Sequence, residues 1–224
     1  MPLTIPQAVL WDMDGTLIDS EHYWMSAERE LAEGAGGEWS EADGQSLIGM
    51  SLYDSSRIIN EKLDIDHGVE RTIELLTDSV QSHLRKQIPW RPGALELLLE
   101  LRERGVKTAL VTMSMHRMAK TVADSTGFDA FDLVLGGDDV RHGKPHPEPY
   151  LKAAELLGVD IRQCIALEDS ISGLASAEAS GAVAIGVPNM VPLPPKPERI
   201  VWPTLQSVTV DDLARLLQEM RPDD

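Results

Sequence analysis

Cysteine is nearly absent from this chain of 224 residues. Because Cys164 is the single cysteine, an intramolecular disulfide is impossible and no cysteine-based zinc site can be assembled. A reducing cytoplasm is therefore the expected location. Residues 1–7 lack the basic start and apolar run of a signal peptide, and no later run of about 18 apolar residues could span a membrane. The sequence predicts a cytoplasmic protein with no membrane partner.

Basic residues are also scarce. The chain has 20 Lys and Arg residues against 37 Asp and Glu residues, which gives a formal net charge of −17 at pH 7. Proteins hold nucleic-acid backbones mainly through Lys and Arg, so this deficit argues against a nucleic-acid partner but leaves a small phosphate substrate open. The hydrophobic fraction of 42% is too high for an acidic disordered tail. The length suits one ordinary domain with an insertion, or two small domains.

Apolar runs of strand length recur along the chain, and segments with helical periodicity lie between them. Continuous hydrophobicity is typical of strands covered on both faces, as in a parallel sheet between helices. Residues 92–104 and 149–157 show helical patterns that end at Gly105 and Gly158. We therefore predict an α/β fold with a doubly wound, Rossmann-like parallel sheet. The predicted strands are Ala8–Trp11, Thr108–Thr112, Leu133–Leu135, Cys164–Leu167 and Ala182–Val187.

The alternation is interrupted between residues 20 and 88, where the pattern is helical throughout. Residues 67–88 carry one apolar stripe at spacings of three or four, which predicts a long helix. We therefore expect an all-helical domain at residues 20–88, inserted into a core domain formed by residues 1–19 and 89–224. The proline-rich stretch at residues 188–197 is predicted to be a surface loop.

Polar residues follow several of the predicted strands. In doubly wound folds, ligands bind at the carboxyl ends of the strands, so these side chains are expected to converge. Carboxylates that crowded repel one another unless a cation joins them, and hard oxygen ligands favour Mg²⁺. The alternative for the first pair alone is an ordinary polar turn after a strand. The residues concerned are Asp12, Asp14, Thr112, Lys144, Glu168 and Asp169.

These residues resemble the motifs of the haloacid dehalogenase superfamily, specifically its phosphatase and β-phosphoglucomutase-like branch with a helical cap. The resemblance covers about residues 7–190, and residues 20–88 fall where this branch inserts its cap. It implies a Mg²⁺-dependent enzyme of phosphoryl transfer. In chain order the matching motifs are Asp12-Met13-Asp14-Gly15-Thr16, Thr112, Lys144-Pro145 and Glu168-Asp169.

The resemblance also implies roles for these residues. Asp12 would be the nucleophile that forms an aspartyl-phosphate, and Asp14 would protonate the departing alkoxide and then activate water. Lys144 would neutralise phosphate charge, and Thr112 would hydrogen-bond a phosphoryl oxygen. The implied Mg²⁺ ligands are the carboxylates of Asp12 and Asp169 and the backbone carbonyl of Asp14, with Glu168 acting through water or by orienting Lys144. The implied substrate contacts after the first two motifs are Thr16, Met113 and Ser114.

The cap is expected to determine which substrate binds. Its substrate loop is predicted at residues 47–52, around Gly49. Leu52 stands where β-phosphoglucomutase-like members carry an arginine for a second phosphate, and Trp24 stands where they carry a histidine. Both differences weaken the mutase interpretation. Together, Leu52, Met50 and Trp24 predict a partly apolar cap surface. Two cations could compensate in a shifted alignment, namely Arg57 and Lys62.

The leading hypothesis is a monomeric, Mg²⁺-dependent phosphatase acting on a small phosphorylated metabolite such as a sugar or polyol phosphate. The alternative within the family is a sugar-phosphate mutase. A phosphonate-cleaving enzyme would need a lysine in the cap loop, and a dehalogenase would lack Asp14. The rival from another class is a binding or regulatory protein without turnover, which would be expected to have lost a catalytic residue.

Other residues are predicted to have structural roles. His142 and His146 flank Lys144 but have no partner at metal-ligand spacing, so they are interpreted as loop residues. Ser170 is predicted to cap a helix, and Gly173 to permit close packing in its first turn. The acidic excess is assigned to solvated helix faces that include Glu28, Glu30 and Glu33.

Overall fold

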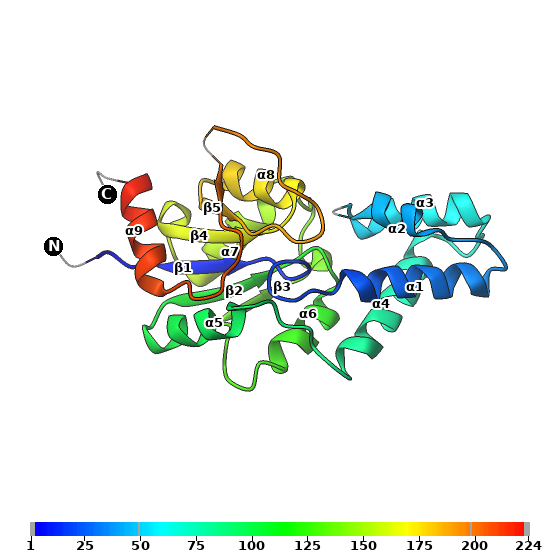
Figure 1. The fold of residues 1–224 in the computed structure, drawn as a ribbon, viewed down its shortest axis with the longest axis horizontal. Coiled ribbons are helices and arrows are strands. Elements are labelled where there is room, and N and C mark those ends of the chain that lie inside the picture. The colour runs from blue at the N-terminus through cyan, green and yellow to red at the C-terminus, as the bar shows by residue number, and fades with distance from the viewer. Residues whose placement is uncertain (1–2, 49, 198, 222–224) are drawn as a thin grey trace.

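Parallel strands form one six-stranded sheet at the centre of the structure, a computed structural model that describes residues 3–48, 50–197 and 199–221 (Figure 1). The strand order is β3-β2-β1-β4-β5-β6, and every neighbouring pair is parallel. This order confirms the prediction of a doubly wound α/β fold. The strands are β1 (Ala8–Trp11), β2 (Lys107–Val111), β3 (Leu133–Leu135), β4 (Cys164–Glu168), β5 (Val183–Gly186) and β6 (Ile200–Val201).

The central strand β1 places the first motif at the middle of the carboxyl edge of the sheet. Trp11 pairs with Leu110 of β2 on one side and with Leu167 of β4 on the other. The next amide, that of Asp12, donates to the carbonyl of Leu167 at 3.0 Å. Because the strands are parallel, the residues that follow them meet at this single edge.

Helices cover both faces of the sheet, and alternate residues of β1 are buried in opposite layers. Val9 and Trp11 pack in one core with α5, α6 and α9, and Ala8 and Leu10 pack in a second core with α7 and α8. The helices of these layers are α5 (Ala94–Glu103), α6 (His116–Asp124), α7 (Glu148–Leu157), α8 (Ile171–Ser180) and α9 (Val210–Met220), with short 3-10 turns at Gly137–Asp139 and Ile161–Gln163.

The segment between β1 and α5 contains helices and no strand among its described residues, and it lies beyond the carboxyl edge of the sheet (Figure 1). α1 packs against α4, and α4 packs against α3 and against α6 of the sheet layers. The chain enters this helical segment near Asp19 and leaves it near Pro89. These two connections lie side by side, because the Asp19 amide donates to the carbonyl of Pro89 at 2.8 Å. Its helices are α1 (Glu21–Gly34), α2 (Glu41–Leu47), α3 (Leu52–Leu63) and α4 (Val69–Leu84).

The predicted elements agree with the structure to within a few residues. The long helix predicted at residues 67–88 is α4, and residues 188–197 form neither helix nor strand. The short edge strand β6 and the C-terminal helix α9 were not predicted. α9 buries Val210, Leu213 and Leu217, a helical spacing that could have revealed it. In the part of the chain that the structure describes, no helix is long and apolar enough to cross a membrane.

Candidate active site

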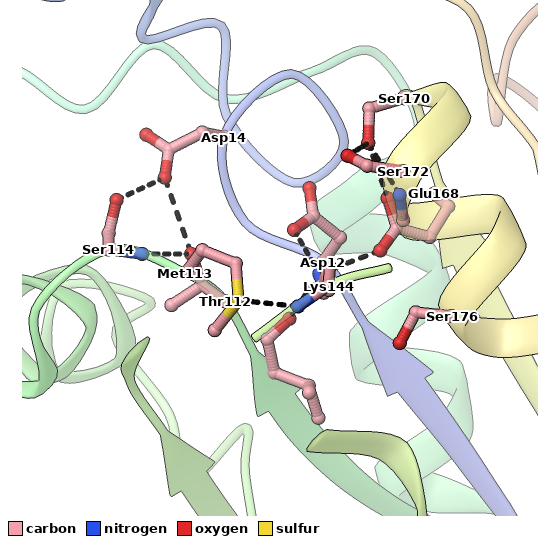
Figure 2. Close-up of polar contacts among 12 residues, drawn as sticks. Asp12, Asp14, Thr112, Met113, Ser114, Lys144, Glu168, Ser170, Ser172 and Ser176 are labelled. Atoms are coloured by element: carbon pink, nitrogen blue, oxygen red, sulfur yellow. Dashed lines mark hydrogen bonds and ion pairs between the residues drawn. The ribbon is translucent and has the colours of Figure 1, made fainter. Parts of the chain in front are cut away.

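Lys144 and two carboxylates form the centre of the site at the carboxyl edge of the sheet (Figure 2). Its ammonium Nζ lies 2.7 Å from Asp12 Oδ1 and 2.6 Å from Glu168 Oε1, and it donates to the carbonyl of Val111 at 2.8 Å. The Tyr150 hydroxyl donates to the same Glu168 oxygen at 2.5 Å. These partners come from the ends of three strands and from α7, so the fold itself positions the lysine.

Three carboxylates meet at this point, since Asp12, Glu168 and Asp169 each place an oxygen within 4.8 Å of the others. Burial, followed by the negative charge of Glu168, raises the pKa of Asp12 to about 7, although Lys144 opposes this shift. Burial and repulsion from Asp12 raise the pKa of Asp169 well above its usual range. Burial lowers the pKa of Lys144, but Asp12 and Glu168 together raise it by more than burial lowers it. The pKa is therefore above its usual value, and the ammonium stays charged.

This cluster fits a divalent cation. One lysine cannot neutralise two buried carboxylates and the half-buried Asp169, and their hard oxygen donors are the ligands that Mg²⁺ prefers. The backbone leaves room for the third carboxylate, because a Cβ built on Gly15 would lie 1.9 Å from Asp169 Oδ2. Gly15 also has a φ of +84°, which other residues rarely adopt.

Asp14 points away from the carboxylate cluster, toward β2 and α1 (Figure 2). Its Oδ1 accepts hydrogen bonds from Ser20 Oγ at 2.5 Å and from Trp24 Nε1 at 3.0 Å. Its Oδ2 accepts from Ser114 Oγ at 2.6 Å and from Thr112 Oγ1 at 3.4 Å. The carboxylate is thus fixed from both the sheet and the helical segment.

A cavity of about 560 Å³ opens above these groups, between the sheet edge and the helical segment. Lys144 and Asp169 line it from the sheet, and Trp24 and Leu52 line it from the helices. The structure does not bring Thr16 to this cavity, because the side chain is fully buried in the tight loop after β1. Gly49 lies outside the described residues. The other predicted residues that line the cavity are Asp12, Asp14, Thr112, Met113 and Ser114.

The family of this chain follows from its similarity to known proteins. A sequence model described as haloacid dehalogenase-like hydrolase matches residues 6–181. The chain belongs to the haloacid dehalogenase-like hydrolase family. The resemblance in the motifs is thereby confirmed, as is the prediction of a hydrolase.

Family members with 27–30% identity match most of the chain. The phosphorylated carbohydrates phosphatase of Thermotoga maritima is 30% identical over 78% of this chain and 82% of its own length. Hexitol phosphatase B of Escherichia coli K12 is 29% identical over 81% of this chain and 83% of its own length. A crystal structure of a hydrolase of the same family from Entamoeba histolytica superposes with a TM-score of 0.84 at 27% identity, covering 94% of this chain and 99% of that one.

Glu28 was predicted to lie on a solvated helix face, and this prediction is wrong. The residue has an exposed fraction of 7% and lines the cavity. Its Oε2 accepts a hydrogen bond from Trp39 Nε1 at 3.1 Å. Glu21 also lines the cavity and was not predicted there. The signal was present in the sequence, because Glu21, Trp24 and Glu28 are spaced by three and four residues, as on one face of a helix. Glu30 and Glu33 are exposed as predicted.

The two cap cations considered from the sequence do not reach the cavity. Arg57 pairs with Glu61 at 2.7 Å on an exposed surface, and Lys62 pairs with Asp43. Neither cation lines the cavity. Leu52 therefore has no nearby cationic substitute among the described lining residues.

The loop that carries Lys144 makes side-chain contacts that the sequence did not predict. His142 was predicted to have no partner at metal-ligand spacing, but its Nδ1 lies 2.7 Å from Glu148 Oε2. His142, His146 and Glu148 each place one possible metal-ligand atom within 4.8 Å of the others. Glu148 also accepts from the amide of Arg141 at 2.7 Å, so it ties the loop to the start of α7. After β4, Ser170 caps α8 as predicted, where its side chain accepts from the amide of Gly173.

Proposed function

We propose that this protein is a Mg²⁺-dependent phosphatase that hydrolyses a small sugar or polyol phosphate through a phosphorylated Asp12. The observation that carries the proposal is the buried Asp12 carboxylate, which faces a cavity and lies 2.7 Å from the Lys144 ammonium. Two relatives named as phosphatases of phosphorylated carbohydrates and hexitols support the substrate class.

In the proposed reaction, an oxygen of Asp12 attacks the phosphorus atom and the bond from phosphorus to the ester oxygen breaks. The departing alkoxide takes a proton from Asp14. A water molecule then attacks the aspartyl-phosphate, gives a proton to Asp14, and releases inorganic phosphate with Asp12 restored. The donors from Ser20, Trp24 and Ser114 hold Asp14 toward the leaving group.

Charge neutralisation is the main task of the surrounding residues, because an anionic nucleophile must approach a phosphate dianion. Lys144 supplies one positive charge beside Asp12, and Glu168 orients this lysine from 2.6 Å. Asp12 and Asp169, together with the Asp14 carbonyl, would hold Mg²⁺. The ion would supply the remaining positive charge at the phosphoryl group.

We further propose that residues 20–88 form a cap domain over a core of residues 1–19 and 89–224. α1 and α2 contribute Trp24, Glu28 and Leu47 to the cavity lining. This placement allows the cap to exclude water from the phosphoryl group and to contact the rest of the substrate.

The lining of the cavity favours a phosphatase over a sugar-phosphate mutase. A mutase must hold a second phosphate while the first reacts, and that phosphate requires a cation in the cap. Among the described residues of the lining, Lys144 is the one Lys or Arg, and it is already paired with Asp12 and Glu168.

The test is phosphate release from a broad panel of monoesters by the purified protein, with Mg²⁺ and with EDTA. We expect release that requires Mg²⁺ and that falls by at least about 10³-fold in Asp12→Asn. The proposal is contradicted if no monoester is hydrolysed or if Asp12→Asn retains activity. Incubation of glucose 1-phosphate with a trace of the 1,6-bisphosphate separates the alternatives, since glucose 6-phosphate formed without free phosphate would favour the mutase.

A further inference from the structure

We propose that Glu28 selects the substrate of this phosphatase, restricting it to monophosphates whose remaining part is uncharged and rich in hydroxyl groups. This inference rests on the proposed function and narrows its substrate class. It assigns Glu28 a role in specificity and none in the chemical step.

The position of Glu28 on α1 places it away from the reacting atoms. Trp24 marks the inner end of the helix face, because its indole nitrogen donates to Asp14, which faces the leaving-group oxygen in the proposed reaction. Glu28 follows four residues later on the same face, about 6 Å further along the helix axis. Both residues line the one cavity that holds Asp12. Glu28 therefore faces the part of the substrate that is remote from phosphorus.

The carboxylate of Glu28 is held in place by its surroundings. Trp39 Nε1 donates to Oε2 at 3.1 Å, and α2 passes so close that a Cβ on Gly44 would lie 3.0 Å from the same oxygen. Among the described residues, no Lys, Arg or His forms an ion pair with this carboxylate. A buried acceptor of this kind is satisfied by a hydroxyl donor from a ligand.

The charge of the cap side of the cavity acts against a second anion. Glu21 lies on the same helix face, and the repulsion from Glu28 is one of the causes, after burial and Asp14, that raise the pKa of Glu21 to about 7. A carboxylate or second phosphate placed here would meet acidic side chains and find no free cation among the described lining residues. A neutral polyol chain would meet hydrogen-bond acceptors instead.

Matched substrate pairs test this inference. Glucitol 6-phosphate and 6-phosphogluconate differ at one end by a hydroxymethyl group against a carboxylate, as do glycerol 3-phosphate and 3-phosphoglycerate. We expect the wild-type kcat/KM at pH 8, where the Glu28 carboxylate is mostly ionised, to favour the member without a carboxylate in each pair by at least about 10-fold. Glu28→Gln keeps an oxygen that accepts from Trp39 and removes the charge, so this variant is expected to reduce the preference by at least about 5-fold.

Glu33→Gln is the matched control, because Glu33 is exposed on the same helix, and it should leave the preference within about 2-fold of wild type. Equal hydrolysis of the two members by wild type overturns the inference, and so does an unchanged preference in a Glu28→Gln protein with wild-type circular dichroism. Activity confined to monoesters outside both pairs also overturns it. The wild-type preference is measured without any variant. In these substrate assays, the absence of all monoester hydrolysis would count against the proposed function itself, whereas equal hydrolysis of the two members would count against this inference alone.

Discussion

Lys144 has a side chain that is 4% exposed and that contacts the carboxylates of Asp12 and Glu168. Removing one partner from a buried ion pair leaves a charge that neither water nor protein compensates, which costs far more than the loss of a surface pair. The lysine therefore stabilises the folded site as well as serving the proposed chemistry.

We predict that Lys144→Met lowers the free energy of unfolding by roughly 3 kcal/mol in EDTA, as measured by urea denaturation. The control is Lys120→Met, because the pair of Lys120 with Asp124 is about 60% exposed on both sides and its loss should change stability by less than about 0.5 kcal/mol. A loss below about 1 kcal/mol for Lys144→Met would contradict this description of the buried pair.

Glu28 gives the second prediction for a single residue. Burial raises its pKa from 4.5 to about 7, and the hydrogen bond from Trp39 only partly offsets this shift. Between these two values the folded protein keeps a proton that the unfolded chain has released. The free energy of unfolding therefore falls as pH rises through this window.

We predict that this fall is less steep in Glu28→Gln than in wild type. The variant should gain on the order of 2 kcal/mol relative to wild type between pH 5 and pH 8, as measured by urea denaturation across that range. Comparing the difference between the two proteins removes the titration of acids that do not interact with Glu28. Parallel stability curves for the two proteins would show that Glu28 titrates normally.

Helix α1 joins the helical segment to the carboxyl edge of the sheet. Trp24 Nε1 donates to Asp14 at 3.0 Å, and Ser20, immediately before the helix, donates to the same oxygen. The position of α1 therefore controls the orientation of the proposed acid. A shift of the helix would break these two hydrogen bonds to Asp14 Oδ1 and leave Oδ2 bonded to Ser114.

We predict that Trp24→Phe lowers kcat by about 10-fold and changes KM by less than about 2-fold, measured by steady-state phosphate release. The indole donor orients the acid, so its loss should affect the chemical step more than binding. Tyr23→Phe is the control, because its hydroxyl donates to the carbonyl of Gln87 and not to the site. An increase in KM without a change in kcat would contradict a role in orienting Asp14.

The core elements were predictable because they depend on local patterns. Buried parallel strands have continuous apolar runs, and the polar residues directly after those runs had to converge at one edge of the sheet. Thus Asp12, Thr112 and Lys144 were found from the sequence, as was the long helix α4. The edge strand β6 is only two residues long and has no such pattern.

The lining of the helical segment was harder to predict because it depends on how separate helices pack together. Glu28 is a charged residue that a helix usually exposes, and only the approach of Trp39 and α2 buries it. Thr16 shows the opposite case, because a polar residue inside a motif is fully buried beneath the site. Neither outcome follows from periodicity alone, since both depend on contacts between segments distant in the sequence.

For the whole molecule, the formal charge of −17 has a local and a general part. The local part is the cluster of Asp12, Glu168 and Asp169, which one lysine does not neutralise. The general part is spread over exposed helix faces and weakens compactness through self-repulsion that any salt screens. A cation bound at the cluster should therefore stabilise the fold in a way that simple salt does not reproduce.

We predict that MgCl₂ at about 100 times its dissociation constant raises the stability by about 2.7 kcal/mol, or roughly 5–10 °C in melting temperature. NaCl at the same ionic strength should give a much smaller shift. Asp169→Asn should lose most of the Mg²⁺-specific shift in a thermal denaturation experiment. Equal shifts from the two salts would contradict a specific Mg²⁺ site. An undiminished shift in Asp169→Asn would place the ion elsewhere.

The proposed reaction requires that Asp12 receives the phosphoryl group, and rapid acid quench of a turning-over reaction traps this covalent intermediate. Peptide mass spectrometry of the quenched wild-type protein should find one phosphoryl group on Asp12, formed before phosphate is released and absent from Asp12→Asn. A phosphoryl group on another residue, or unchanged phosphate release by Asp12→Asn, would contradict the role of Asp12 as the nucleophile.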